Sequence, residues 1–377
     1  MKNVIVYLYL MFYSMEYAFA SCPKAMELYD QAVESPGNTE ELLQKAINIC
    51  PNFTSAMFAL ASIKYHKNDF DMALTLLEKI SKLDTSLDAQ LLYSATLISL
   101  KRYQNAESVL RELLKKNASD SRVLNALAIV YEGLEKYSEA ERFLRRALQE
   151  DQSNSLILFN LSRILFMQNQ FDQALESIDG SLLLDATSNE SRFFKIKILQ
   201  SASQIEKAKI ELVNLIEQNA NANALFYRDA ALYADLLNDS ELSYRLSEKA
   251  SGLDEDSLIL YLEYLEKKLV REPLTRRDKA EILLEFESKI KSASNIDIDS
   301  FDTISWIGLQ LNNLELATIY ADKALKHFPE DCLIITNRGL IALKSKDYES
   351  AKTFLNKAID VNPDCVIARE ELDKIID

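Results

Sequence analysis

The chain has few of the residues that break secondary structure. Its 377 residues include only 6 glycines and 6 prolines. A β-sandwich or barrel needs turn-forming residues after each of many short strands. The glycine-rich loops that cradle nucleotide phosphates need glycines at fixed spacings. The sequence therefore argues against both an all-β fold and a nucleotide-binding fold with such loops.

Residues that commonly carry catalysis or bind metals are also scarce. The only histidines are His66 and His327, far apart in the sequence, and none of the four cysteines lies in a C-x-x-C motif. We find no Ser-His-Asp arrangement, Walker-type loop or G-x-S-x-G motif. The sequence therefore predicts a protein that is not an enzyme and has no cofactor and no metal site.

Positive charge is in deficit. The chain has 43 Lys and Arg against 58 Asp and Glu, a net charge of −15 and a pI near 4.8. Such a surface repels phosphate backbones, so we expect no nucleic-acid partner. The hydrophobic share of 48% is typical of a folded protein rather than a disordered one.

Long apolar runs are absent except near the start. Lys2 precedes an uncharged run from Val4 to Tyr13, and Ala18 and Ala20 form an A-x-A site. This predicts a signal peptide over 1–20 and a periplasmic or secreted protein. The alternatives are an uncleaved signal anchor and a lipoprotein modified at Cys22, both of which would associate with the membrane and face the periplasm.

What the sequence does have is a period of 34 residues. Small residues recur where two helices would touch, and another small residue stands 12 positions earlier in most units. In most units an aromatic residue stands three positions before the recurring alanine. Between these landmarks the apolar spacing is helical. The recurring alanines are Ala73, Ala106, Ala140, Ala174 and Ala208, and again Ala317 and Ala351.

These landmarks resemble the tetratricopeptide repeat family. One unit reads SRVLNALAIVYEGLEKYSEAERFLRRALQEDQ (121–152), and another reads CLIITNRGLIALKSKDYESAKTFLNKAIDVNP (332–363). Small contact residues let two antiparallel helices approach closely, and hairpins must stack to bury their apolar faces. The resemblance implies an all-α fold: an α-solenoid, a right-handed superhelix of about ten antiparallel helical hairpins with a C-terminal capping helix.

The repeats divide the chain into segments. We expect a repeat array over 21–256, an irregular longer hairpin over 257–297, a second array over 298–365 and a capping helix over 366–377. Within the irregular hairpin, a helix over 257–270 is followed by a break at Pro273. Thr275 and Asp278 have the spacing of a capping box at the start of the next helix.

The cysteines form two sets within this hairpin scheme. Cys22 and Cys50 bracket the first hairpin, and Cys332 and Cys365 bracket the last. Each pair joins the start of a first helix to the end of the second, and those ends lie side by side. This predicts two disulfides in an oxidising compartment. The alternative is four buried free thiols in a cytosolic protein.

In this family the first helix of each hairpin lines the inner groove of the array. The second, fifth, ninth, twelfth and thirteenth residues of a unit face that groove. Here these positions are rich in aromatic, aliphatic and cationic residues, types that dominate binding energy at interfaces. The alternative is that several pack against the neighbouring hairpin. The predicted groove residues are Phe58, Tyr65, Ile129, Phe159, Arg163, Phe166, Phe193, Lys197 and Arg228, with Leu91, Ile98 and Asn125 as further members.

The resemblance implies a binding function. We expect a non-catalytic scaffold or assembly factor in an exported compartment, holding a protein or peptide segment in the groove. An apolar segment with some acidic residues would suit it. The set of Lys, Asn and Arg residues with which chaperone-binding relatives clamp a free carboxylate is missing. The alternative is an accessory or regulatory subunit that recruits substrate to a separate enzyme, such as a glycosyltransferase or a polysaccharide-synthesis complex.

Overall fold

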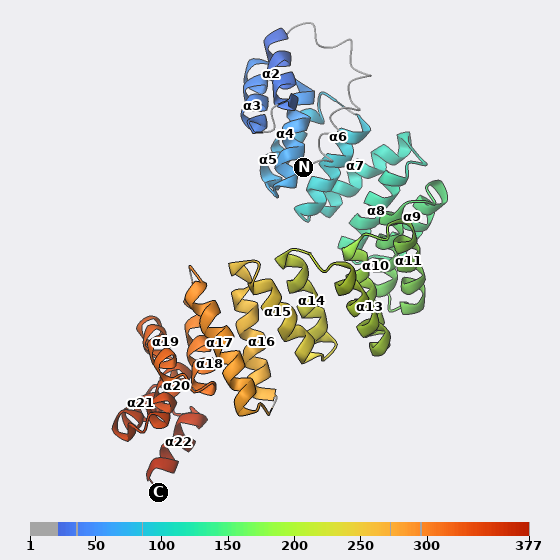
Figure 1. Ribbon diagram of the computed structural model, residues 1–377. Coiled ribbons are helices and arrows are strands. Elements are labelled where there is room, and N and C mark those ends of the chain that lie inside the picture. The colour runs from blue at the N-terminus through green and yellow to red at the C-terminus, as the bar shows by residue number, and fades with distance from the viewer. Residues whose placement is uncertain (1–21, 35–36, 85, 272, 295, 377) are drawn as a thin grey trace. The chain divides into compact units, whose positions relative to one another are not determined.

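The computed structural model describes residues 22–34, 37–84, 86–271, 273–294 and 296–376. Across these ranges the chain is all-α, with 21 α-helices, one short 3-10 helix and no strand (Figure 1). Within each compact part of the chain, consecutive helices pair as antiparallel hairpins, and a last helix follows the final pair. The predicted α-solenoid class is therefore confirmed. The predicted signal peptide over 1–20 lies outside the described residues.

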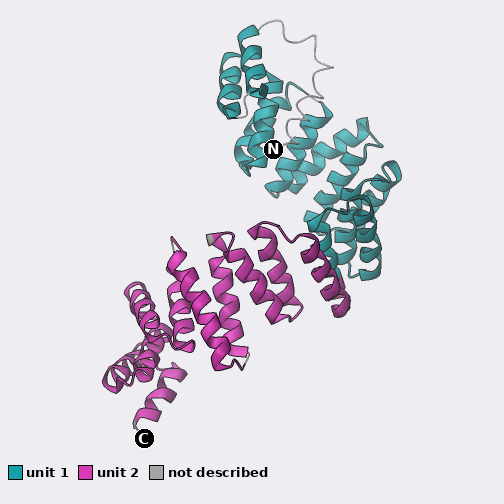
Figure 2. Ribbon diagram, in the orientation of Figure 1, with its two compact units in different colours: residues 1–198 teal, residues 199–377 magenta. Residues whose placement is uncertain are grey.

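The chain separates into two compact units (Figure 2). The division falls between Ile198 and Leu199, inside helix α12 (Asn189–Ser201). Unit 1 also contains α2 (Pro23–Glu34), α3 (Thr39–Ile49), α4 (Thr54–His66), α5 (Phe70–Ile80), α6 (Leu87–Ser99), α7 (Tyr103–Lys116), α8 (Ser121–Gly133), α9 (Tyr137–Glu150), α10 (Ser155–Met167) and α11 (Phe171–Leu184).

Unit 2 begins with the last residues of α12 and continues to the end of the chain. It contains the irregular hairpin, formed by α16 and α17, and the short helix η2 just before it. Its helices are α13 (Ile205–Gln218), α14 (Ala224–Leu236), α15 (Ser240–Ser251), η2 (Glu255–Ser257), α16 (Leu258–Arg271), α17 (Arg276–Ser292), α18 (Ser300–Gln310), α19 (Leu314–His327), α20 (Cys332–Lys344), α21 (Tyr348–Val361) and α22 (Val366–Ile376).

The repeating small residues mark the contact between the two helices of a hairpin. Each of the seven recurring alanines is completely buried. The approach is close enough for side chain to reach backbone across the hairpin. The hydroxyl of Ser162 donates to the carbonyl of Ala174 at 2.9 Å, and Ser305 donates to Ala317 at the same distance. A larger residue at either position would push the helices apart.

The turn inside the hairpin also repeats. One residue there adopts a left-handed conformation with φ between 57° and 65°, and it is never glycine. The next backbone N–H closes the first helix, as Lys136 does by donating to the carbonyl of Tyr131 at 2.8 Å. This is the hydrogen bond of a Schellman cap. The eight left-handed residues are Asn68, Lys101, Glu135, Asn169, Ser203, Asn238, Asn312 and Lys346.

The irregular hairpin of unit 2 has a longer second helix. Its α17 spans 17 residues and starts with a capping box. The Thr275 hydroxyl accepts from the Asp278 N–H at 3.2 Å, and the Asp278 carboxylate accepts from the Thr275 N–H at 2.9 Å. The predicted capping box is thus confirmed. Tyr261 and Phe286 fill the core between α16 and α17.

Among the described helices, none combines the length and the apolar character that a membrane crossing requires.

Candidate functional site

In unit 1 the candidate partner-binding surface is the face of the first helices α8, α10 and α12. Its centre is a cluster of aromatic rings. The ring of Phe166 lies 5.5 Å from that of Phe194 and 5.7 Å from that of Phe171, and Phe159 lies 5.6 Å from Phe194. The ammonium of Lys197 stands 5.4 Å from the Phe166 ring centre. Aromatic faces attract such a cation, so Lys197 is held over the cluster.

Two of the predicted groove residues are not available to a partner. Phe159 and Phe193 are each only 8% exposed. Phe159 packs edge-on against Phe194 of the neighbouring hairpin. The prediction that these two rings line an open groove was therefore wrong, because both are buried, and Phe194 of the adjacent hairpin covers Phe159. Sequence reasoning did not name Phe194, which supplies that cover.

Other predicted residues lie partly in the core. Phe58 and Tyr65 pack against the buried core of helices α2 to α6, and Phe166 packs against the buried core of helices α5 to α12. Ile129 is half-buried. The structure exposes Leu156 and Met167 on α10 instead, to 57% and 48%. Both occupy groove positions of their repeat, the second and the thirteenth, so the same rule would have found them.

The cations of this surface differ in their pairing. The Arg163 guanidinium donates to the Glu132 carboxylate at 2.6 Å and lies 6.0 Å from the Phe159 ring centre. Burial raises the pKa of Glu132, and the charge of Arg163 opposes that rise. Lys197 is exposed and forms no ion pair with any described residue. Lys197 is therefore the free positive charge at the cluster.

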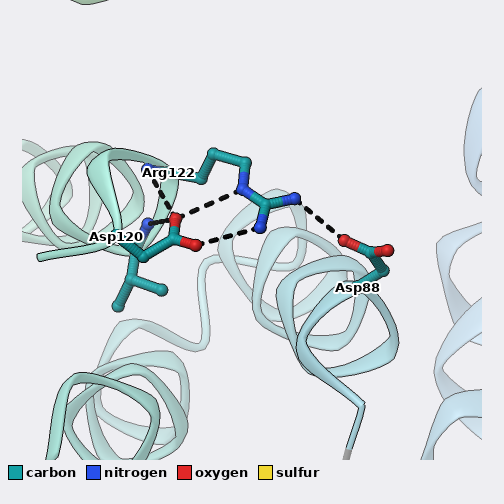
Figure 3. Close-up of polar contacts among 4 residues, drawn as sticks. Asp88, Asp120 and Arg122 are labelled. Carbon is teal, nitrogen blue, oxygen red and sulfur yellow. Dashed lines mark hydrogen bonds and ion pairs between the residues drawn. The ribbon is translucent and has the colours of Figure 1, made fainter. Parts of the chain in front are cut away.

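Arg122, on the same series of helices, is neutralised by two acids (Figure 3). Its guanidinium donates to Asp120 at 2.9 Å and, one repeat away, to Asp88 on α6 at 3.0 Å. Asp120 also caps α8 by accepting from backbone N–H groups. Burial favours a higher pKa for Asp120, but its hydrogen bonds and charge contact with Arg122 outweigh that effect and lower the pKa. Arg122 therefore links two neighbouring repeats, and its charge is already paired.

Arg228 does not belong to the unit 1 surface. It lies on α14 in unit 2, half-buried beside Asp229. Burial raises the pKa of Asp229, and Arg228 partly offsets this rise. The nine predicted groove residues are thus divided between the two units, with eight in unit 1.

The cysteines form one disulfide. Cys22 and Cys50 are bonded, with their Cα atoms 6.2 Å apart. Cys332 and Cys365 are free thiols, which differs from the predicted second disulfide. The Cys365 thiol donates to the Cys332 carbonyl at 3.6 Å and lies within hydrogen-bond distance of the Thr336 hydroxyl, at 3.4 Å. A hydrogen bond between the two thiols, with burial, raises the pKa of Cys332 to about 11.

Comparison with protein-family models places the repeats in a known family. Tetratricopeptide repeat models match residues 96–155, 133–197 and 334–365. A model for subunit 3 of the anaphase-promoting complex, or cyclosome, matches residues 37–113. No curated protein matches the chain in a sequence search.

One solved structure shares the fold, and two others are similar to parts of the chain. A tetratricopeptide repeat protein from Parabacteroides merdae is 13% identical, with 64% of this chain and 98% of that one covered and a TM-score of 0.51. PilF from Pseudomonas aeruginosa is 21% identical over 57% of this chain and 97% of its own, with a TM-score of 0.44. MamA from Desulfovibrio magneticus is 18% identical over 44% and 98%, with a TM-score of 0.40. The family models show that the chain is a tetratricopeptide repeat protein.

Proposed function

We propose that this tetratricopeptide repeat protein is a non-catalytic scaffold or assembly factor that acts in an exported compartment. Proteins of this family act as protein–protein interaction scaffolds. In this chain the partner segment would lie on the α8–α10–α12 face of unit 1.

The observation that carries the proposal is the group of exposed side chains around the aromatic cluster. Leu156 and Met167 are about half exposed on α10, and Lys197 projects from α12 without an ion-pair partner in the described chain. Exposed apolar side chains on one face, with a polar rim, are typical of an interaction site. Met is well suited to such a face because its side chain adapts its shape.

The partner's chemistry follows from these groups. Its apolar side chains would cover Leu156 and Met167, and a carboxylate would pair with Lys197. The ammonium already stands over the Phe166 ring, so part of its freedom is lost before binding. An apolar segment with an acidic residue is therefore the ligand that this face fits.

The test compares two charge reversals of equal size. Lys197→Glu should reduce capture of the partner from the native envelope fraction by about tenfold, a loss typical of a desolvated charge pair. Arg146→Glu is the matched control, because Arg146 is exposed on the second helix α9. Equal capture by both variants would contradict the site. A captured glycosyltransferase would favour the accessory-subunit role over the scaffold role.

Export is tested separately by mass spectrometry of the mature protein from its native source. We expect an N-terminus at Ser21 and no reactive thiol at Cys22 or Cys50. An intact Met1 would contradict cleavage, and a lipid on Cys22 would replace the disulfide with a membrane anchor.

A further inference from the structure

The first helix of the irregular hairpin in unit 2 carries an exposed stripe that is apolar at its ends and acidic in the middle. Ile259 and Val270 on α16 are 45% and 68% exposed. Between them stand Glu263, which is exposed, and Glu266, which is half-buried. Successive spacings of four, three and four residues place all four on one side of the helix.

The stripe continues on the preceding first helix, α14. Leu225, Leu232 and Leu236 are exposed to 59%, 47% and 54%, and their spacing also defines one side of a helix. The two helices are tied together near this side, because the ammonium of Lys267 lies 2.9 Å from the carboxylate of Asp235. An exposed set of this extent is more than the scattered apolar residues normal on a protein surface.

On the other side of α16, α18 adds a third carboxylate. Burial raises the pKa of Asp302, although a hydrogen bond from Asn337 opposes the rise. The Asn337 amide donates to the Asp302 carboxylate at 3.0 Å. Asn337 is only 5% exposed, and its carbonyl oxygen has no hydrogen-bond partner among the described residues. The Asp302 carboxylate is thus held by the neutral Asn337 amide, which does not cancel its charge.

These carboxylates lack cations. Glu263, Glu266 and Asp302 form no ion pair with any described residue, whereas Glu241 and Asp322 elsewhere in unit 2 pair with Lys268 and Arg338. The pKa of Glu266 is raised by burial and then by repulsion from Asp302 and Glu263. Like charges held close together in a partly desolvated place cost free energy that a cation would relieve.

Two cations on α14 and α16 already have acidic neighbours outside this stripe. Lys267 on α16 is already paired with Asp235. Arg228 on α14 acts on its neighbour Asp229. The face made by Ile259, Glu263, Glu266, Val270 and Asp302, which we call the acidic face, therefore has an excess of negative charge.

We propose that the acidic face binds a partner segment in which lysine or arginine side chains stand beside apolar ones, as in a basic amphipathic helix. The cationic groups would lie among Glu263, Glu266 and Asp302, and the apolar ones would cover Ile259, Val270 and the leucines of α14. The inference rests on the proposed protein-binding function but concerns a different unit and the opposite charge. Nucleic acid and anionic lipid are repelled by the same carboxylates.

The test uses the full chain and a defined synthetic peptide, an amphipathic helix of leucine and lysine labelled with a fluorophore. Binding is measured by anisotropy. Removing the three charges in Glu263→Gln, Glu266→Gln, Asp302→Asn should weaken binding by about tenfold or more. The pair Glu263→Gln, Glu266→Gln should weaken it in the same direction, and this variant leaves the part-buried Asp302–Asn337 contact intact.

The matched control removes three exposed charges elsewhere in unit 2, in Glu330→Gln, Glu349→Gln, Asp360→Asn. Its binding should stay within about twofold of the unmodified chain, because distant surface charges are screened by salt. Equal weakening by both triple variants would show that only net charge attracts the peptide and would overturn the proposal. Absence of binding by the unmodified chain would overturn it as well.

Two further peptides check the ligand chemistry. A leucine–glutamate peptide of the same pattern should not bind, and a lysine–serine peptide should bind more weakly because it lacks the apolar contact. The Lys197→Glu variant should bind the leucine–lysine peptide normally. That result would separate this face from the site proposed in unit 1, since either can fail while the other holds.

Discussion

At the scale of single residues, the hairpin turns carry a strain that the repeat pattern did not reveal. Eight turns place an L-residue in the left-handed region, and four of them use Asn, which tolerates it best. Lys101, Glu135, Ser203 and Lys346 tolerate it less well. The tight turn imposes the conformation because the following N–H must close the helix. Asn stands at half of these positions and Lys, Glu or Ser at the others, so no single residue type marks the turn.

Replacing Glu135 with glycine should stabilise the protein. Glycine removes the left-handed cost of about 1–2 kcal/mol and loses part of that gain to chain entropy, so we expect a net gain of about 0.5–1 kcal/mol. Lys136→Gly is the control, since Lys136 has an ordinary φ of −94°. The control should lose stability. Guanidinium unfolding of both variants measures the change, and a loss in Glu135→Gly would contradict the account.

The half-buried carboxyl of Glu132 makes stability depend on pH. Its pKa is raised by burial, and Arg163 opposes the rise. The folded pKa lies above the unfolded one, so ionisation above the folded pKa disfavours the fold and protonation at lower pH relieves it. Arg163→Ala should therefore destabilise by about 1–3 kcal/mol at neutral pH. The loss should shrink as pH falls through the folded pKa of Glu132. Thermal melts across pH test this, and a pH-independent loss would contradict it.

At the scale of elements, the small contact residues set the distance between paired helices. Ala174 is fully buried, and its carbonyl accepts from Ser162 on the facing helix. Ala174→Leu should cost about 1–3 kcal/mol by forcing α10 and α11 apart. Glu176→Leu, at an exposed position of the same helix, is the control and should change little. Equal denaturation midpoints for the two variants would contradict the packing described.

The last hairpin brings two free thiols together, because the Cys365 thiol donates to the Cys332 carbonyl at 3.6 Å. Mild oxidation with a disulfide reagent should join Cys332 and Cys365 and reduce the reagent by one equivalent. Closing this loop should stabilise the C-terminal end by roughly 3–4 kcal/mol on the chain-entropy model. Counting alkylated thiols before and after oxidation measures the reaction, and Cys332→Ser should abolish it. Two thiols that stay reactive after oxidation would contradict the geometry.

Element positions could be predicted from the sequence, while side-chain exposure could not. The aromatic landmarks Phe70, Tyr103 and Tyr137 do begin second helices, and the capping box at Thr275 is present. The position of a residue within the repeat predicts which side of the helix it faces. It does not show whether a neighbour covers that side. Phe194 covers Phe159 because a large ring stands at a position of the next repeat that is not a groove position.

At the scale of the whole molecule, one repeat type builds faces of different character. Unit 1 offers leucine, methionine and a free lysine around an aromatic cluster. Unit 2 offers leucines beside three uncompensated carboxylates. The backbone scaffold is the same, so the exposed residues of each first helix decide what can bind. The chain's net charge of −15 does not describe either face.

The most direct measurement places a photo-reactive amino acid at Leu156 on α10 and, in a separate protein, at Arg146 on α9. Each is illuminated in the native envelope fraction, and the crosslinked proteins are identified. A polypeptide that crosslinks from position 156 and not from 146 is the predicted result. Crosslinks from 146 alone, or equally from both, would contradict the claim that the first helices present the binding surface.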